Sequence, residues 1–290
     1  MSELANIGAI RTLMERHGFH FSKAMGQNFI INPGICPKIA EQGGADQMVG
    51  ALEIGPGIGV LTKELALRCR KVVAVELDTR LLPVLAETLA DFDNVTIVNG
   101  DILSIDLHEL LAREFAGMEV IVCANLPYYI TSPVIMRLLE ERLPLQSLTV
   151  MVQKEAAQRL CAPLPSRQAG AITAAVAYYT RPSLLFSVSP GSFMPAPKVE
   201  SAVIRLEVRD TPAVSVADED FYFRIIKAAF SQRRKTLLNC LASNFPVTKA
   251  DAAALLAGAG VPANARGEEL SLEDFARLLP LKELLQAPTK

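Results

Sequence analysis

One segment combines an amide, a proline and two aromatic rings: Asn125-Leu126-Pro127-Tyr128-Tyr129. It directly follows an apolar run at residues 120–124, and Pro127 favours an extended turn there. Such a turn suits chemistry on the exocyclic amine of adenine, a poor nucleophile because its lone pair is delocalised into the ring. The Asn125 side-chain carbonyl and a backbone carbonyl near Leu126 can accept both amine hydrogens, which favours the tetrahedral nitrogen of a transition state. Tyr128 offers a face on which the base can stack.

The alternative interpretation of this segment is that Asn125 is an ordinary turn residue before a proline. Its position directly after a predicted strand favours the catalytic interpretation.

A second motif is a glycine-rich turn at residues 53–59, Glu-Ile-Gly-Pro-Gly-Ile-Gly, between an apolar run and a helical pattern. Glycines there allow a tight turn and a close approach of the backbone to a ligand. Glu76 ends the next apolar run about 20 residues later, where acidic side chains hold ribose hydroxyls in doubly wound folds. Asp101 follows the third apolar run at the same predicted sheet edge. Each feature has an alternative interpretation: the glycines serve only packing, Glu76 is a solvated acid at a strand end, and Asp101 only forms a turn.

The spacing of the glycines limits which class of ligand can bind. It is GxGxG with an internal proline, not the GxGxxG of pyrophosphate binding, and GxxxxGK[ST] does not occur in the sequence. NAD and ATP are therefore disfavoured. S-adenosylmethionine is an adenosine-containing ligand without a pyrophosphate, and we predict it as the cofactor.

These motifs need a sheet to bring them together. Short apolar runs alternate with helical patterns, which is typical of a parallel sheet covered by helices. We predict seven strands, at residues 51–54, 72–76, 95–98, 120–124, 148–152, 184–188 and 201–208. Helices are predicted at residues 60–69, 80–90, 107–115 and 132–141. The short link before the last strand predicts an antiparallel final pair, and the whole pattern resembles a Rossmann-like α/β methyltransferase fold.

The pattern changes after Asp210, where β-branched runs stop and Thr211-Pro212 interrupts the chain. The remainder indicates helices separated by glycines and prolines. We therefore predict two domains: residues 1–210 form a catalytic domain that binds S-adenosylmethionine, and residues 211–290 form a small all-helical RNA-binding domain.

A basic segment supports the second assignment. Residues 221–250 contain no carboxylate and six cations: Arg224, Lys227, Arg233, Arg234, Lys235 and Lys249. If one helix covers residues 221–235, one of its faces carries Arg224, Lys227, Ser231, Arg234 and Lys235. The whole chain has a net charge of -2, so any affinity for nucleic acid must come from a local basic patch. The cations on this face can contact the phosphates of an RNA backbone. The alternative is a solvated helix face.

Composition sets further expectations. No uncharged apolar run reaches the roughly 18 residues of a membrane span, and the first 17 residues lack the pattern of a signal peptide. We expect a cytoplasmic protein that does not bind membranes. The five cysteines are scattered without CxxC or Cys/His spacing, so we expect reduced thiols and no metal site.

The chain resembles the KsgA (RsmA) type of small-subunit ribosomal RNA adenine dimethyltransferases over nearly its whole length. The resemblance rests on GQNF at residues 26–29, LEIGPGIG at 52–59, VAVELD at 73–78, NGDIL at 99–103, NLPYYI at 125–130, FMPAPKVESAV at 193–203 and AFSQRRKTLLN at 229–239.

The resemblance implies roles for single residues toward the cofactor. Asn28 and the backbone of Ile30 are expected to close over S-adenosylmethionine. Gly55 is expected to meet its methionine end, Glu76 its ribose and Asp101 its adenine. Asn125 is expected to border both the cofactor and the target base.

The resemblance also implies the substrate contacts. Phe193 is expected to stack on the target adenine opposite Tyr128; the alternative is a phenylalanine packed into the core. Arg233, Arg234 and Lys235 are expected to bind RNA.

The activity implied is dimethylation of the 6-amino groups of two adjacent adenosines near the 3′ end of 16S ribosomal RNA, within an assembling small subunit, by a monomer. One alternative is a large-subunit ribosomal RNA methyltransferase of the antibiotic-resistance type. Another is a ribosome-assembly or transcription factor that uses the same fold for binding. The complete NLPY motif and cofactor set favour an enzyme.

Overall fold

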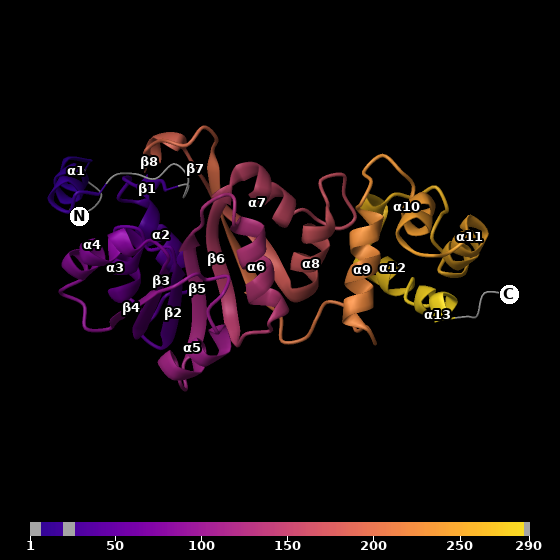
Figure 1. Ribbon diagram of the computed structural model, residues 1–290, viewed down its shortest axis with the longest axis horizontal. Coiled ribbons are helices and arrows are strands. Elements are labelled where there is room, and N and C mark those ends of the chain that lie inside the picture. Colours follow the sequence, from indigo (N-terminus) through magenta and orange to yellow (C-terminus); the bar gives the residue numbers. More distant parts are fainter. Residues whose placement is uncertain (1–6, 20–26, 287–290) are drawn as a thin grey trace. The chain divides into compact units, whose positions relative to one another are not determined.

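The computed structural model describes residues 7–19 and 27–286 of the 290 (Figure 1). Gly26, part of the GQNF motif, lies outside the described residues. The chain divides into two compact units, Met1–Ala157 with Pro182–Val208, and Gln158–Arg181 with Arg209–Lys290. Compared with the predicted division after residue 210, the segment Gln158–Arg181 belongs to the second unit instead of the first.

The first unit is built on a seven-stranded sheet in the order β4-β3-β2-β5-β6-β9-β7 (Figure 1). Its strands are β2 (Val49–Ile54), β3 (Lys71–Glu76), β4 (Val95–Asn99), β5 (Glu119–Asn125), β6 (Leu145–Gln153), β7 (Thr180–Val188) and β9 (Ser201–Val208). The strands β2 to β6 pair in parallel, and β9 runs antiparallel to β6. The seven strands and the methyltransferase fold predicted from the sequence are confirmed.

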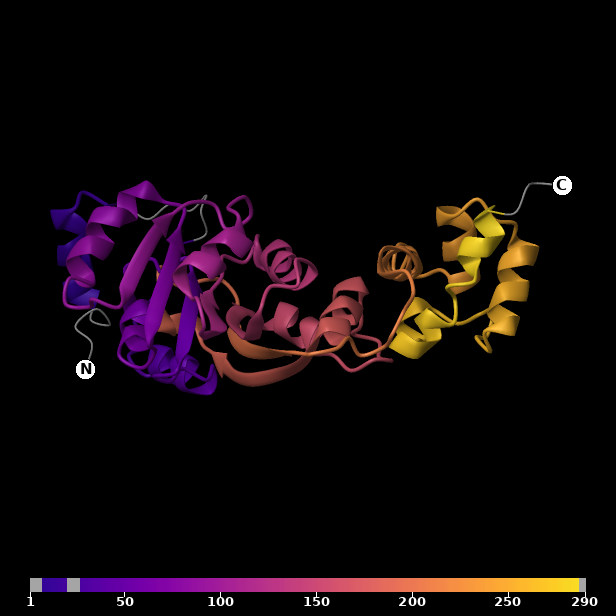
Figure 2. The same cartoon turned by 90° about the horizontal axis from the view of Figure 1, so that it is seen from below.

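Helices cover both faces of this sheet (Figure 2). They are α1 (Ile7–Arg16), α2 (Ile35–Gln42), α3 (Val60–Ala66), α4 (Leu82–Thr88), α5 (Leu107–Glu114), α6 (Thr131–Glu140) and the start of α7 (Lys154–Leu160). All six residues of β2 are buried, as are the first four of β9. Strands enclosed on both faces are mostly apolar, which is why near-continuous apolar runs marked them in the sequence.

One small element was not predicted. β1 (Phe29–Ile30) pairs antiparallel with β8 (Phe193–Met194), so that Phe29 lies opposite Met194 and Ile30 opposite Phe193. This ribbon joins the segment before α2 to the loop before β9. Two residues in each strand give no periodicity from which it could be recognised.

The second unit is helical, as predicted. It contains α8 (Ala171–Tyr179), α9 (Glu219–Ala229), α10 (Leu237–Asn244), α11 (Lys249–Gly258), α12 (Leu272–Ala276) and α13 (Leu281–Gln286). None of the helices in the described residues is long and apolar enough to span a membrane.

The prediction of one helix over residues 221–235 is wrong, because α9 ends at Ala229. The Ser231 hydroxyl donates to the Ala228 carbonyl at 2.7 Å, and the next helix starts from its own N-cap, Thr236, whose side chain accepts from the Asn239 N–H. Arg233, Arg234 and Lys235 therefore lie in the turn between α9 and α10. They do not continue a helix face with Arg224 and Lys227.

The packing of β2 generates a stability prediction. A methyl group added at Gly50 would lie 2.3 Å from Cδ1 of the Phe115 ring, far inside van der Waals contact. Gly50→Ala should therefore lower the free energy of unfolding by about 1 to 3 kcal/mol. Gly191→Ala is the matched control, since an added methyl there meets no atom within 4 Å. Equal denaturation midpoints for the two variants would show that the sheet accommodates the methyl group.

Candidate active site

A cavity opens at the carboxyl ends of β2, β3 and β5, where strand order reverses on either side of β2. Open sheets of this type bind ligands at such a reversal. The space between its walls, with the solvent at its open mouth included, is about 1050 Å³. Its lining comes from residues 27–30, 53–58, 60–61, 75–77, 100–102 and 125–130, together with Leu81.

The predicted glycine turn forms one wall. Gly55, Gly57 and Gly59 have φ angles of 68°, 60° and 87°, a region that side chains with a Cβ rarely adopt. A Cβ added at Gly55 would meet no atom within 4 Å, whereas one at Gly57 would lie 3.1 Å from the Phe29 ring. At Gly55, therefore, the positive φ angle favours glycine, and packing does not. The space in front of this residue is open.

Glu76 lies in the pocket wall with 6% of its surface exposed. Its Oε1 accepts from the Asp78 N–H at 2.8 Å, and its Oε2 accepts from the Gly57 N–H at 3.3 Å. Burial raises the pKa of this carboxyl, and the two N–H groups partly offset that effect. The carboxylate is thus fixed in direction and keeps lone pairs for hydroxyl groups of a ligand.

Glu53 is a pocket residue that sequence reasoning missed. Its side chain is 1% exposed, and its Oε2 has no hydrogen-bond partner among the described residues. Burial, with a smaller contribution from the charge of Glu76, raises the pKa of Glu53 to about 8. The signal was present, since an acid inside the apolar run of residues 51–54 is unusual.

Asp101 lies at the edge of the pocket. Its Oδ1 accepts from the Leu103 N–H at 2.9 Å, and its backbone carbonyl accepts from the N–H groups of Ser104 and Ile105. The turn-forming role considered from the sequence is therefore present. The same turn keeps Asp101 beside the cavity.

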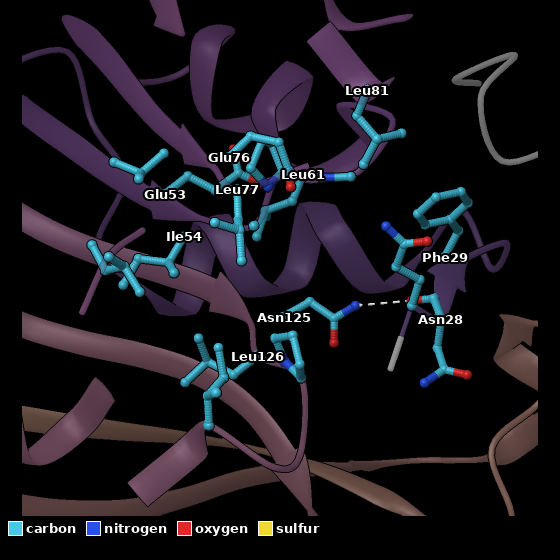
Figure 3. A pocket seen from close by; sticks show the side chains of 18 of the residues that line it. Asn28, Phe29, Glu53, Ile54, Leu61, Glu76, Leu77, Leu81, Asn125 and Leu126 are labelled. Carbon is cyan, nitrogen blue, oxygen red and sulfur yellow. Dashed lines mark hydrogen bonds between the residues drawn. The ribbon is translucent and has the colours of Figure 1, made fainter. Parts of the chain in front are cut away.

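Asn125 ends β5 opposite the glycine turn, and its side-chain amide is oriented by the chain itself. Nδ2 donates to the backbone carbonyl of Asn28 at 3.1 Å (Figure 3). A carbonyl only accepts hydrogen bonds, so the NH₂ end of the amide must face Asn28. The oxygen of the same amide points in a different direction, as Figure 3 shows.

The aromatic residues of the motif differ in their surroundings. The Tyr128 hydroxyl forms a 2.7 Å hydrogen bond with the Ser201 hydroxyl, which fixes the ring. Tyr129 also borders the pocket but is 59% exposed.

Other predicted site residues lie elsewhere. Phe193 is 3% exposed and belongs to the hydrophobic core, the arrangement considered as its alternative. Its stacking on a target base stays a prediction that requires the side chain to leave the core. Arg233, Arg234 and Lys235 are exposed residues of the second unit.

Known proteins are similar to this chain over nearly its whole length. The family model described as ribosomal RNA adenine dimethylase matches residues 18–283. A protein of Geobacillus thermodenitrificans named ribosomal RNA small subunit methyltransferase A is 47% identical over 95% of this chain and 96% of its own length. A protein of the same name from Bacillus mycoides is 45% identical over 96% of this chain and 97% of its own length.

Two solved structures are also similar. A dimethyladenosine transferase from Plasmodium falciparum superposes with a TM-score of 0.74 at 24% identity, covering 89% of this chain and 98% of that one. The 23S rRNA methyltransferase ErmE gives a TM-score of 0.65 at 27% identity, covering 90% of this chain and 100% of its own.

The buried acid Glu53 generates a pH prediction. Its pKa is raised from 4.5 to about 8 in the folded protein, so between these values the unfolded chain ionises Glu53 while the folded protein does not. The free energy of unfolding should therefore fall by about 1.4 kcal/mol for each pH unit gained in this window. Glu53→Gln, neutral at every pH, should lack this contribution.

The check is urea denaturation of both proteins at pH values of about 5.5, 6.5 and 7.5, which lie inside this window. The stability difference between variant and wild type should shift in favour of the variant as the pH rises, because other titrating groups are common to both. Parallel curves would mean that Glu53 ionises normally.

Proposed function

The chain belongs to the ribosomal RNA adenine dimethylase family, and from that membership we propose that its pocket binds S-adenosylmethionine and methylates two adjacent adenosines near the 3′ end of 16S ribosomal RNA. The family's reaction places methyl groups on the 6-amino nitrogen, giving N(6)-dimethyladenosine. The observation that carries the assignment to this pocket is the orientation of the Asn125 amide.

That orientation supplies the acceptor that the chemistry needs. Because Nδ2 is held by the Asn28 carbonyl, Oδ1 is the end that can accept a hydrogen of the target amine. The Pro127 carbonyl accepts from the Ile130 N–H at 3.1 Å within the turn, so we assign the second acceptor to the backbone carbonyl of Leu126. Two acceptors favour a tetrahedral nitrogen and stabilise the transition state more than the planar ground state. No strong general base is then required.

The pocket residues fit the cofactor proposed for them. S-adenosylmethionine, when bound, supplies an electrophilic methyl group. Glu76 offers a fixed carboxylate for the ribose hydroxyls, and Asp101 lies where the adenine is expected. The space in front of Gly55 suits the methionine end, and Asn28 with the Ile30 backbone borders the same cavity. Tyr128, fixed by Ser201, is proposed to stack on the target base.

The choice of RNA rests on the relatives. Those named for the small subunit share 45 to 47% of residues over nearly the whole chain, whereas the 23S enzyme shares 27%. We therefore propose the small-subunit RNA, within an assembling subunit, as the substrate of a cytoplasmic monomer. The large-subunit enzyme is the second candidate. A factor that only binds RNA is disfavoured because the oriented Asn125 amide lies in the same pocket as the residues expected to bind the cofactor.

The test supplies labelled S-adenosylmethionine together with undermethylated small or large ribosomal subunits. Label in N(6)-dimethyladenosine of the small-subunit RNA is expected. Asn125→Ala should lower the single-turnover rate at saturating substrate by about two to three orders of magnitude, as other removals of a transition-state hydrogen bond do. Label confined to large subunits would overturn the substrate, and a normal rate for Asn125→Ala would overturn the catalytic assignment.

The basic turn generates a separate prediction. If Arg233, Arg234 and Lys235 bind phosphates, replacing all three by Gln should lower RNA affinity and flatten the slope of log K against log salt by roughly 0.7 to 0.9 for each phosphate no longer neutralised. The affinity for S-adenosylmethionine should stay unchanged, because the pocket belongs to the other unit. The measurement is RNA binding by both proteins across a salt series, with binding of S-adenosylmethionine as the control for folding. An unchanged slope would identify these cations as a solvated turn.

A further inference from the structure

Asp78 holds an unusual position beside the pocket. It is 5% exposed and follows Glu76 by two residues, but it is not among the residues that line the cavity. Its Oδ2 accepts from Gln27 Nε2 at 2.9 Å and from Arg80 Nη2 at 2.7 Å, and its Oδ1 accepts from the Arg80 backbone N–H and Nε. Hydrogen bonds from Arg80, then from Gln27, hold the pKa of Asp78 below its usual range. The carboxylate is therefore ionised, and both of its oxygens accept hydrogen bonds.

Gln27 is the first residue of a segment that lines the cavity, residues 27–30, which we call the strap. All four strap residues border the cavity. The strap is held at three points: Gln27 by Asp78, the Asn28 carbonyl by Asn125, and Phe29 with Ile30 by pairing with β8. It thus connects the end of β3, which carries Glu76, with the end of β5, which carries Asn125.

We propose that Asp78 is a positioning residue for methyl transfer, which holds the strap through Gln27 so that the Asn28 carbonyl orients the Asn125 amide. The inference rests on the proposed function of Asn125. Asp78 is 51 residues from Gln27 in the sequence, and Asn28 is 97 residues from Asn125, so three distant stretches of chain meet in this arrangement.

The physical reason is that the two ends of an amide have similar size but opposite hydrogen-bonding roles. An Asn125 amide turned by half a rotation would present NH₂ to the target amine, and two donors would then face each other. The Asn28 carbonyl prevents this, since it can pair only with NH₂. A displacement of the strap by about 1 Å is sufficient to remove such control, and misplacements of this size cost up to about a hundredfold in rate.

The deciding variant is Gln27→Met, which keeps the length of the side chain and removes its hydrogen bond to Asp78. The matched control is Gln146→Met, which removes a hydrogen bond of the same kind, from Gln146 Nε2 to the Glu119 carboxylate, at the amino ends of β5 and β6 and away from the cavity. Asp78 is left unchanged in both variants, so its hydrogen bonds with Arg80 remain.

The measurement is the single-turnover rate of methyl transfer at saturating S-adenosylmethionine and RNA, so that weaker binding does not enter, with cofactor affinity measured alongside. Gln27→Met is expected to be slower by about tenfold or more, and Gln146→Met to stay within about threefold of wild type. A Gln27→Met rate equal to wild type, or a Gln146→Met rate as slow as that of Gln27→Met, overturns the proposal.

Asn125→Ala in the same assay separates this inference from the proposed function. If Asn125→Ala transfers methyl groups at the normal rate, the catalytic assignment fails and this inference with it. If Asn125→Ala is inactive and Gln27→Met is not slowed, the catalytic assignment holds and only the role of Asp78 fails.

Discussion

The position of β2 between β3 and β5 is the constraint on which the site depends. The chain adds β3 and β4 on one side of β2 and then returns to add β5 and β6 on the other. The segments that follow β2 and β5 therefore leave the sheet in opposite directions and leave a crevice at their carboxyl ends. The glycine turn, Glu76 and Asn125 each follow or end one of these three strands, so one feature of strand order brings them together.

Two buried carboxyl groups in that crevice are stabilised in different ways. Glu76 receives two backbone N–H groups, which compensate an ionised carboxylate for the water it gives up. Glu53 has an oxygen without a partner in the described residues, and with a pKa of about 8 it is mostly protonated at neutral pH. A protonated Glu53 exerts no charge repulsion on Glu76, whose carboxyl group is held in a fixed direction where a ligand with hydroxyl groups can use it.

Much of the catalytic unit could be predicted because its signals are local. Buried parallel strands are mostly apolar, and the motif residues end them or come directly after them. The ribbon of β1 and β8, the hydrogen bond of Gln27 to Asp78 and that of Asn125 to Asn28 could not be predicted, because each joins residues far apart in the sequence. The burial of Phe193 could not be predicted either. The motif alone does not tell whether its phenylalanine faces a substrate or packs into the core, where it lies in this structure.

The end of α9 is also set by distant contacts, which explains why periodicity predicted too long a helix. No glycine or proline occurs between residues 229 and 236 to mark a stop. A methyl group at Gly267 would lie 2.9 Å from the Ala229 carbonyl oxygen, so that segment packs closely against the last residue of α9. The Leu237 N–H donates to the Ala265 carbonyl at 2.7 Å, which holds the start of α10 to the same segment. The turn that carries the three cations is therefore fixed at both ends, and a fixed turn loses less conformational entropy than a flexible one when it binds an RNA backbone.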